Sequence, residues 1–203
     1  PNTDVNVLES FPEYSPFSNV DEHKLQMTLH DLLSMRVGIE WDEWSTAYGN
    51  PNNSWTQVAE TFNWVKTFLF MPMDSEPGST FNYNTAAPTV ITQLVENFTG
   101  IDDEMFIQEE LFSPLGIDQV AWQMSNSGEL HSGGGLFISR RDMAKFGQLY
   151  LNGGEWQGQR IIDESWIEES TTGITALDWG DNTMAYGLQW WTNQFSLSGT
   201  AIN

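Results

Sequence analysis

Apolar residues at helical spacing predict that the first half of the chain is mostly helical. Thr28 stands before an apolar run, and Asp31 follows it by three positions, which resembles a capping box. The run predicts one buried helix face, and Gly38 supplies a helix stop. Its members are Leu29, Leu32, Leu33 and Met35. The preceding segment, Pro1–Glu22, is rich in turn residues, so we expect an extended connection there.

A second amphipathic pattern predicts a single helix from Trp55 to about Leu69. Ser54 and Gln57 have the spacing of a capping box before this helix. The segment Asp42–Asn53 is rich in Asn, Gly and Pro, so it should form a loop. The predicted buried face of the helix consists of Val58, Phe62, Val65 and Phe68.

Two further helices are predicted before the pattern changes. Apolar residues from Val90 to Val95 indicate one helix, which Gly100 should end. Asp102 is placed to cap the next helix, predicted over Asp103–Phe112.

The second half of the chain mixes helices with short apolar runs typical of strands. Ser139 with Asp142 should cap a helix over Arg140–Leu151, and Asp163 should open another. The predicted strands are Val120–Trp122, Leu136–Ile138, Arg160–Ile162 and Met184–Trp191. Helices followed by mixed helices and strands indicate an α+β fold.

Charge limits the classes of partner. The chain has 203 residues, with 7 Lys and Arg against 28 Asp and Glu, so its formal net charge is −21. Nucleic acids and anionic membranes attract basic surfaces, so neither is an expected partner. No apolar run approaches the length of a membrane span. The acidic residues are spread along the chain, which indicates a strongly solvated surface.

The composition indicates neither a metal site nor a cofactor. Cysteine is absent, which excludes disulfides, thiolate zinc sites and a cysteine nucleophile. The histidines, His23, His30 and His131, do not form a metal-binding motif. We interpret His131, which precedes three glycines, as a polar residue of a flexible loop. Tryptophans are expected mainly in the core. Carboxylate pairs such as Glu168–Glu169 are expected on solvated helix faces rather than in a glycosidase site.

A nucleophile motif is missing from the sequence. A serine nucleophile needs a neighbouring base, yet neither Gly-x-Ser-x-Gly nor Ser-x-x-Lys occurs. The residues three positions before Lys24, Lys66 and Lys145 are Asp21, Asn63 and Asp142.

Four ordered stretches nevertheless resemble one enzyme family. A Pro-Gly turn leads to a tyrosine at the start of a helix in Pro77–Tyr83 (PGSTFNY). The other stretches are Met27–Ile39 (MTLHDLLSMRVGI), Leu111–Ile117 (LFSPLGI) and Gly133–Gly154 (GGGLFISRRDMAKFGQLYLNGG). Their order and spacing are similar to those of the β-lactamase-related serine hydrolases. That group includes class C β-lactamases, D-alanyl-D-alanine peptidases, family VIII esterases and 6-aminohexanoate-dimer hydrolases.

The resemblance implies a fold and a chemistry. The fold would be β-lactamase/penicillin-binding-protein-like, with mostly its helical part and part of its antiparallel sheet in this chain. A serine would attack an amide or ester carbonyl and form an acyl-enzyme. Tyr83 would be the catalytic tyrosine, and Asn84 and Thr85 would bind substrate. A tyrosine, with a reference pKa of about 10, acts as a base only where cations stabilise its phenolate.

One position departs from the family pattern. The family often has Tyr-x-Asn, whereas Thr85 occupies the third position here. Threonine donates one hydrogen bond but lacks the paired donor and acceptor of an amide. Ester or amide cleavage is therefore favoured over β-lactam hydrolysis.

The resemblance also places two motifs outside the sequence. Ser-x-x-Lys should precede Pro1 and a final strand motif should follow Asn203, so residues 1–203 are expected to be a partial domain that is inactive alone. The alternative is a catalytically inactive binding module with the same fold. Many relatives are exported, which implies a periplasmic or secreted protein, with the cytoplasm as the alternative. The expected partner is a small-molecule amide or ester, and the oligomeric state stays open.

Overall fold

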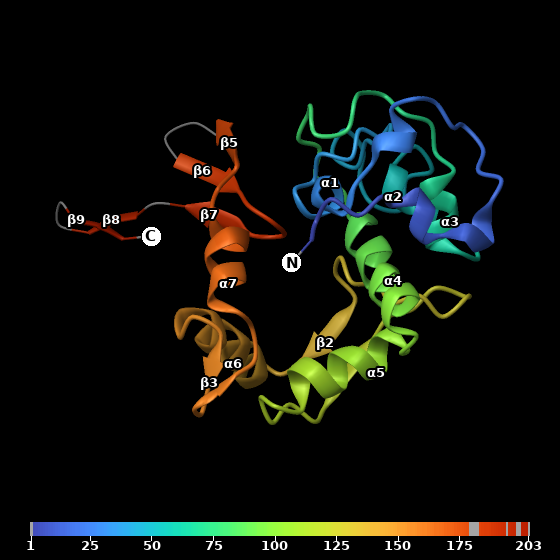
Figure 1. The fold of residues 1–203 in the computed structure, drawn as a ribbon. Coiled ribbons are helices and arrows are strands. Elements are labelled where there is room, and N and C mark those ends of the chain that lie inside the picture. Colours follow the sequence, from blue (N-terminus) through green and yellow to red (C-terminus); the bar gives the residue numbers. More distant parts are fainter. Residues whose placement is uncertain (1, 179–182, 194, 198–199, 203) are drawn as a thin grey trace.

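The computed structural model describes residues 2–178, 183–193, 195–197 and 200–202. Helices dominate the first half, and short antiparallel strands with further helices make up the second (Figure 1). This arrangement confirms the predicted α+β class. Among the described residues, every helix is too short or too polar to cross a membrane.

The N-terminal segment belongs to the core, so the prediction of a bare extended connection is wrong. It contains the 3-10 turns η1 (Leu8–Ser10) and η2 (Pro12–Tyr14), and η3 (Lys24–Gln26) follows. Val7 and Phe11 are fully buried. Burial of these apolar side chains folds the segment onto the helices that follow it.

Helix α1 (Leu29–Leu33) begins as predicted but ends early. The Thr28 hydroxyl accepts from the Asp31 N–H, and the Asp31 carboxylate accepts from the Thr28 N–H, which confirms the capping box. The helix ends before Met35, which has a φ of 57°. Gly38 does not end the helix as predicted. A glycine is needed there because a Cβ would collide with the carbonyl oxygen of Ser75.

The single helix predicted from Trp55 to Leu69 is wrong. The structure has two, α2 (Ser54–Ala59) and α3 (Trp64–Leu69), and each is capped by an asparagine. Asn53, not Ser54, caps α2 and accepts from the Thr56 N–H at 3.1 Å. Asn63 caps α3, and its side-chain oxygen accepts from the Lys66 N–H at 2.6 Å. Phe62 lies in the break and is 67% exposed instead of buried.

The next helices agree with the sequence analysis. Helix α4 (Ala87–Thr99) ends at Gly100, which has the left-handed φ of 68°. The Asp102 carboxylate accepts from the Met105 N–H and caps α5 (Asp103–Ile107). A π-helical turn, η4 (Gln108–Phe112), continues α5 to the predicted end.

The second half contains four small antiparallel sheets within the described residues. The predicted strands β1 (Val120–Trp122) and β2 (Leu136–Ile138) both form, and they pair antiparallel. Helix α6 (Arg140–Leu151) is capped by Ser139, as predicted, and helix α7 spans Glu164–Thr171. The remaining strands are β3 (Glu155–Trp156), β4 (Gln159–Arg160), β5 (Thr175–Asp178), β6 (Thr183–Tyr186), β7 (Trp191–Asn193), β8 (Phe195–Leu197) and β9 (Thr200–Ile202).

Two strand predictions need correction. The strand predicted over Met184–Trp191 is a hairpin, because Gln189 takes a positive φ of 63° and reverses the chain between β6 and β7. The strand predicted over Arg160–Ile162 ends at Arg160, where β4 pairs with β3.

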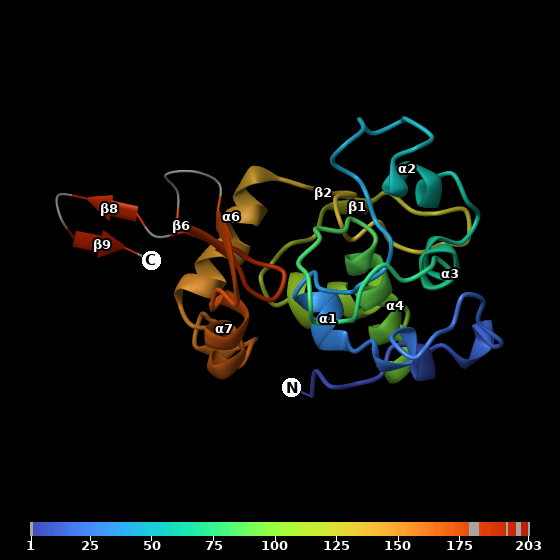
Figure 2. The same cartoon turned by 90° about the horizontal axis from the view of Figure 1, so that it is seen from above.

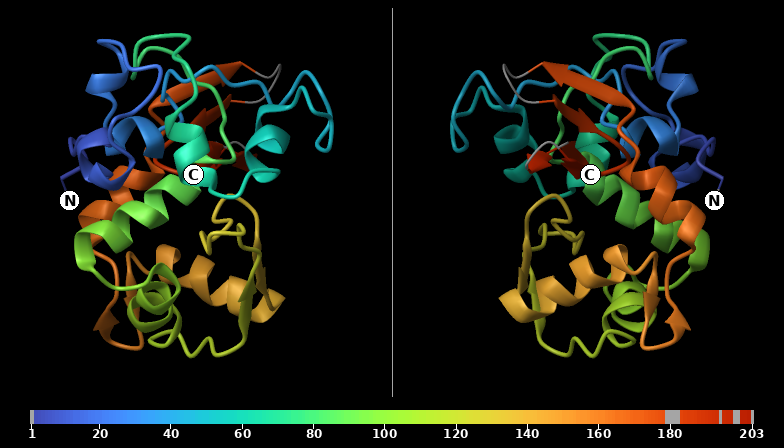
Figure 3. Two further views of the ribbon diagram at one scale, coloured as in Figure 1. Left: turned by 90° about the vertical axis from the view of Figure 1, so that its right-hand side faces the viewer. Right: turned by 90° about the vertical axis from the view of Figure 1, so that its left-hand side faces the viewer.

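The C-terminal sheet returns to the N-terminal helices. The Gln189 N–H donates to the Leu33 carbonyl oxygen at 2.9 Å, although the two residues are far apart in the sequence. Tyr186 is 2% exposed and joins the main core formed by the N-terminal segment and α1–α4. The sheet β5–β6–β7 accordingly lies beside α1 (Figure 3), whereas the β8–β9 hairpin extends away from the rest (Figure 2).

A second, smaller core lies under the β1–β2 hairpin and α6. Its buried members are Phe112, Leu115, Ile117 and Leu149. Helices α4 and α5 connect the two cores (Figure 1). The region around the start of α4 is therefore fixed by the main core, by β6 and by the loops that meet there.

Candidate active site

The turn before α4 delivers Tyr83 to the surface of the main core. The Gly78 N–H donates to the Arg36 carbonyl oxygen, and the Asn82 N–H donates to that of Met35, both at 2.8 Å. The Asn82 amide also donates to the Trp41 carbonyl oxygen at 2.7 Å. These bonds tie the turn to the strand-like segment that follows α1, so the backbone is held directly before Tyr83.

Aromatic rings from three parts of the chain surround Tyr83, which is half-buried. Trp44, on the loop before α2, lies 5.8 Å away between ring centroids. Tyr186 of β6 meets the Tyr83 ring edge-on at 6.2 Å, and Trp191 of β7 lies at 5.5 Å. Such tilted and edge-on pairs are favourable geometries for aromatic rings. The contacts place a phenol from the middle of the chain between an N-terminal loop and the C-terminal sheet.

The surroundings favour the neutral phenol of Tyr83. Burial raises the pKa of Tyr83 above its usual value, and the negative charge of Glu43 and the nearby Tyr48 raise it further. A tyrosine that acts as a base needs a cation to oppose these effects. Among the described residues, the groups that influence this pKa are acidic or phenolic.

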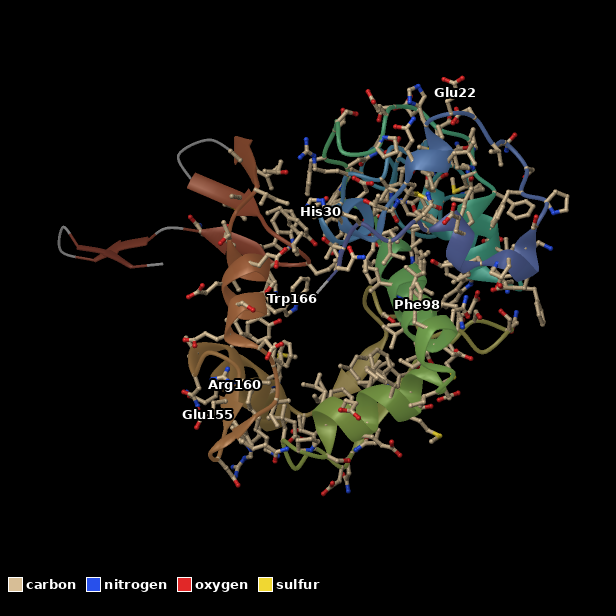
Figure 4. The ribbon with its side chains drawn as sticks, in the orientation of Figure 1. Glu22, His30, Phe98, Glu155, Arg160 and Trp166 are labelled. Carbon is tan, nitrogen blue, oxygen red and sulfur yellow. The ribbon has the colours of Figure 1, made fainter. Side chains whose placement is uncertain are left out.

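Three of the cations among the described residues are engaged away from Tyr83. Lys24 is fully buried, and its ammonium donates to the carbonyl oxygens of Leu69 and Met71 at the end of α3. Lys145 pairs with Asp142 at 2.8 Å. Arg160 lies near Glu155 on the β3–β4 hairpin, with 3.9 Å between Nη2 and Oε2 (Figure 4).

Asn84, predicted to bind substrate, forms a hydrogen-bonded turn directly before α4. Its side chain is 2% exposed, and its oxygen accepts from the N–H groups of Ala86 and Ala87 at 2.9 and 3.0 Å. These bonds occupy the amide oxygen and fix the chain between Tyr83 and the first residue of α4. A contact between Asn84 and a substrate stays a prediction.

Thr85, the position that departs from the family pattern, binds a buried carboxylate. The Thr85 hydroxyl donates to Glu43 Oε1 and its N–H donates to Glu43 Oε2, both at 2.9 Å. Because the hydroxyl hydrogen is engaged, Thr85 can meet a substrate only as an acceptor. Its predicted role in substrate binding stays a prediction.

A glycine-rich loop packs against the same segment. Gly133 lies so close to Thr85 that a Cβ at this position would collide with the Thr85 carbonyl oxygen. The Thr89 hydroxyl donates to the Leu130 carbonyl oxygen at 3.0 Å. The hydroxyls of Thr92 and Ser132 also lie within hydrogen-bond distance, at 3.0 Å. This loop therefore supports the Tyr83 segment from the side of the β1–β2 hairpin.

The interpretation of His131 as a polar loop residue is wrong. Its side chain is 8% exposed and packs on the ring of Trp55 at 4.5 Å and against the edge of Trp64 at 5.7 Å. Burial lowers the pKa of His131, so its ring is neutral near pH 7. Trp64 lies in the core as expected, whereas Trp191 is 37% exposed beside Tyr83.

Sequence reasoning missed Glu43 and Trp44. Glu43 is 3% exposed, and Trp44, the next residue, is 61% exposed and lies against Tyr83. Both come from a segment that its composition marks only as a loop. The sequence signal there is an acidic residue among aromatic ones. This signal points to a site only once the fold is known.

Within the described residues, no three acidic or histidine side chains gather as metal ligands.

Comparisons with known proteins agree with this fold. A Bacillus anthracis protein provisionally named 6-aminohexanoate-dimer hydrolase superposes with a TM-score of 0.73 at 21% identity, over 94% of this chain and 52% of that one. A D-stereospecific amidohydrolase from a Streptomyces species gives a TM-score of 0.70 at 17% identity, over 99% and 66%. These likenesses define the class of fold as that of β-lactamases and penicillin-binding proteins, as the sequence predicts.

The sequence comparisons give the family. The sequence model of the β-lactamase family matches residues 4–203, so the chain belongs to the β-lactamase family. The 6-aminohexanoate-dimer hydrolase of Paenarthrobacter ureafaciens is 24% identical over 193 residues, which cover 85% of this chain and 48% of that enzyme. The chain thus spans about half the length of this relative.

Proposed function

We propose that the full-length protein is a serine hydrolase that cleaves a small-molecule amide or ester through an acyl-enzyme intermediate. Tyr83 is the proton-transfer residue in this proposal. Its placement supports the role: a half-buried phenol, held by a turn at the start of α4, in a chain of the β-lactamase family. The serine and lysine of a Ser-x-x-Lys motif would come from a part of the protein outside these 203 residues, because the motif is absent from them.

The proposed cycle moves one proton through Tyr83. With Tyr83 as the phenolate, its oxygen accepts the proton of the serine hydroxyl while the serine oxygen bonds to the substrate carbonyl carbon. The proton then passes to the leaving amine or alcohol as the scissile bond breaks. Water releases the carboxylic acid from the acyl-enzyme and restores the serine hydroxyl. The lysine ammonium would supply the cation that the described surroundings of Tyr83 do not provide.

The removal of the Tyr83 hydroxyl tests the proposal. In the full-length protein, Tyr83→Phe should lower kcat/KM for p-nitrophenyl acetate by about 100-fold to 10,000-fold, the usual contribution of a positioned acid–base group. Tyr150→Phe is the matched control, because Tyr150 lies on α6 against Trp190, away from Tyr83. Tyr150→Phe should leave turnover near the wild-type value. Equal turnover by wild type and Tyr83→Phe would remove Tyr83 from the mechanism.

A fluorophosphonate probe distinguishes the proposed hydrolase from an inactive binding module with the same fold. The full-length protein should be labelled on one serine followed three residues later by lysine, and residues 1–203 alone should stay unlabelled. A full-length protein that neither reacts with the probe nor hydrolyses esters would favour the binding module.

A further inference from the structure

Glu43 is a buried carboxylate at the centre of the loop that covers the Tyr83 segment. The side chain is 3% exposed, and its four hydrogen-bond partners come from two segments. Oε2 accepts from Trp41 Nε1 and from the Thr85 N–H, each at 2.9 Å. Oε1 accepts from the Thr85 hydroxyl at 2.9 Å and from the Tyr48 hydroxyl at 3.4 Å.

The number and kind of these donors require a carboxylate. A carboxylate is acceptor-only and offers enough lone pairs for four donors, whereas an amide would direct its NH2 group at some of them. Hydrogen bonds to a charged acceptor are about twice as strong as neutral ones. Burial of a carboxylate without hydrogen-bond partners costs free energy. The four donors therefore hold the Glu43 carboxylate in this position.

Hydrogen bonds hold the backbone of Glu43 as well as its side chain. The Asn53 amide donates to the Glu43 carbonyl oxygen at 3.1 Å and to that of Thr46 at 2.9 Å. Asn53 is also the cap of α2, so Glu43 is connected to a helix of the main core. Glu43 therefore provides a fixed point to which the segment around Thr85 is attached.

The geometry places this fixed point beside the proposed proton-transfer group. Thr85 follows Tyr83 by two residues, and Trp44, which packs against the Tyr83 ring, follows Glu43 directly. The negative charge of Glu43 also raises the pKa of Tyr83. The titratable groups that face Tyr83 in the described structure are Glu43 and Tyr48 from the loop and Tyr186 from β6.

We propose that Glu43 is a positioning residue for the reaction: its carboxylate, bound to the hydroxyl and N–H of Thr85, fixes the phenol of Tyr83 in place. This inference rests on the proposed function, in which Tyr83 transfers the proton. It also explains the threonine at the third position of Tyr-x-Thr. The hydroxyl of Thr85 serves the carboxylate of Glu43, where an asparagine at this position would present an amide.

Glu43→Gln in the full-length protein tests the inference. We expect kcat for p-nitrophenyl acetate to fall about 10-fold to 100-fold with a change in KM below about threefold, since the misplaced group acts on the chemical step. Glu129→Gln is the matched control. Glu129 is also a buried carboxylate with four donors, but it binds the N–H groups of Trp64 and Val65 and the hydroxyls of Ser125 and Ser127. An unchanged kcat, or an equal loss in Glu129→Gln, would overturn the inference.

A titration separates this inference from the proposed function. The NMR signal of 13Cζ-labelled tyrosine reports the pKa of Tyr83 directly, and Tyr83→Phe assigns the signal. Glu43→Gln should lower this pKa, because the mutation removes a neighbouring negative charge. An unchanged pKa would count against Glu43 whether or not the protein hydrolyses esters. If the serine-hydrolase proposal is wrong, Tyr83→Phe will instead hydrolyse the ester as fast as the wild type.

Variants of Thr85 keep the inference testable if Glu43→Gln fails to fold. Thr85→Val removes the hydroxyl that binds Glu43, and Thr85→Ser keeps it. We expect Thr85→Val to lower kcat in the same range and Thr85→Ser to retain most of it. A substrate contact would instead appear mainly in KM. Equal kcat values for the valine and serine variants would contradict the positioning role of the Glu43–Thr85 bond.

Discussion

Several carboxylates of this acidic chain are buried, and their surroundings differ. Glu43 and Glu129 each accept hydrogen bonds from four donors. Asp103, the first residue of α5, is 6% exposed and has acidic neighbours. Burial raises the pKa of Asp103 to about 6, the charge of Glu96 adds to this effect, and a backbone hydrogen bond from Glu104 opposes it. A charged Asp103 therefore works against folding at neutral pH.

The sign of this effect gives a pH-dependent prediction. The folded chain holds the Asp103 proton up to about pH 6, whereas the unfolded chain releases it near the ordinary aspartate pKa of 3.8. As the pH rises through this range, the free energy of unfolding of the wild type should therefore decrease. At pH 8, Asp103→Asn should raise the free energy of unfolding by about 1 to 2 kcal/mol, because each pH unit between the two pKa values corresponds to about 1.4 kcal/mol and burial of the amide offsets part of the gain.

Urea denaturation at pH 8 and at pH 3.5 measures the change. The stabilisation should vanish at pH 3.5, where the carboxyl is protonated in both states. Asp118→Asn is the control, since Asp118 is exposed. A gain for Asp103→Asn that is equal at both pH values would contradict the assigned cause.

Among the elements, the glycine-rich loop after His131 packs directly against the Tyr83 segment. Gly133 lies against the backbone of Thr85, and a Cβ there would also come within 3.1 Å of the Thr85 methyl group. A side chain at this position can be accommodated only if one of the two segments moves. The loop and the Tyr83 segment are therefore coupled through direct contact.

Gly133→Ala tests this coupling. We expect a loss of about 1 to 3 kcal/mol in the free energy of unfolding, the range for overpacked positions, together with a lower kcat as Tyr83 shifts. Gly147→Ala is the matched control within α6, where nothing lies within 4 Å of the added Cβ. It should stabilise the protein by about 0.5 to 1 kcal/mol. Thermal unfolding and ester turnover of both variants measure the effects, and a Gly133→Ala protein as stable and active as wild type would refute the coupling.

Elements that depend on local signals could be predicted from the sequence. The Thr28–Asp31 capping box, the Gly100 stop and the Asp102 cap are formed by residues within a few positions of one another. The break between α2 and α3 could not be predicted in this way. There the carboxylate of Glu129, 65 positions from Trp64, binds the first N–H groups of α3. No pattern within the helix itself carries that information.

The residues of the candidate site divide in the same way, into those that local sequence signals predict and those that only the fold brings together. The family resemblance led to Tyr83, because the Pro-Gly turn and the helix start lie next to it in the sequence. Glu43 could not be found, because its bond to Thr85 spans 42 positions and its loop has no periodic pattern. The aromatic neighbours Trp44 and Trp191 likewise meet Tyr83 only in the folded chain.

At the scale of the whole molecule, Tyr83 depends on the return of the C-terminal sheet to the N-terminal core. The hairpin of β6 and β7 is tied to the end of α1 through Gln189, and Tyr186 is buried in the core beneath Tyr83. The phenol thus lies where three distant parts of the chain meet. This convergence, in a chain of the β-lactamase family, supports a role for Tyr83 in acyl transfer.

Intact-protein mass spectrometry of the full-length protein, mixed with p-nitrophenyl acetate and quenched at successive times, tests this role most directly. The account predicts that the wild type gains one acetyl group on a serine before steady-state turnover, and that Tyr83→Phe gains it about 100-fold or more slowly. Acetylation of Tyr83→Phe at the wild-type rate, or ester turnover by the wild type without an acetyl-enzyme, would contradict it.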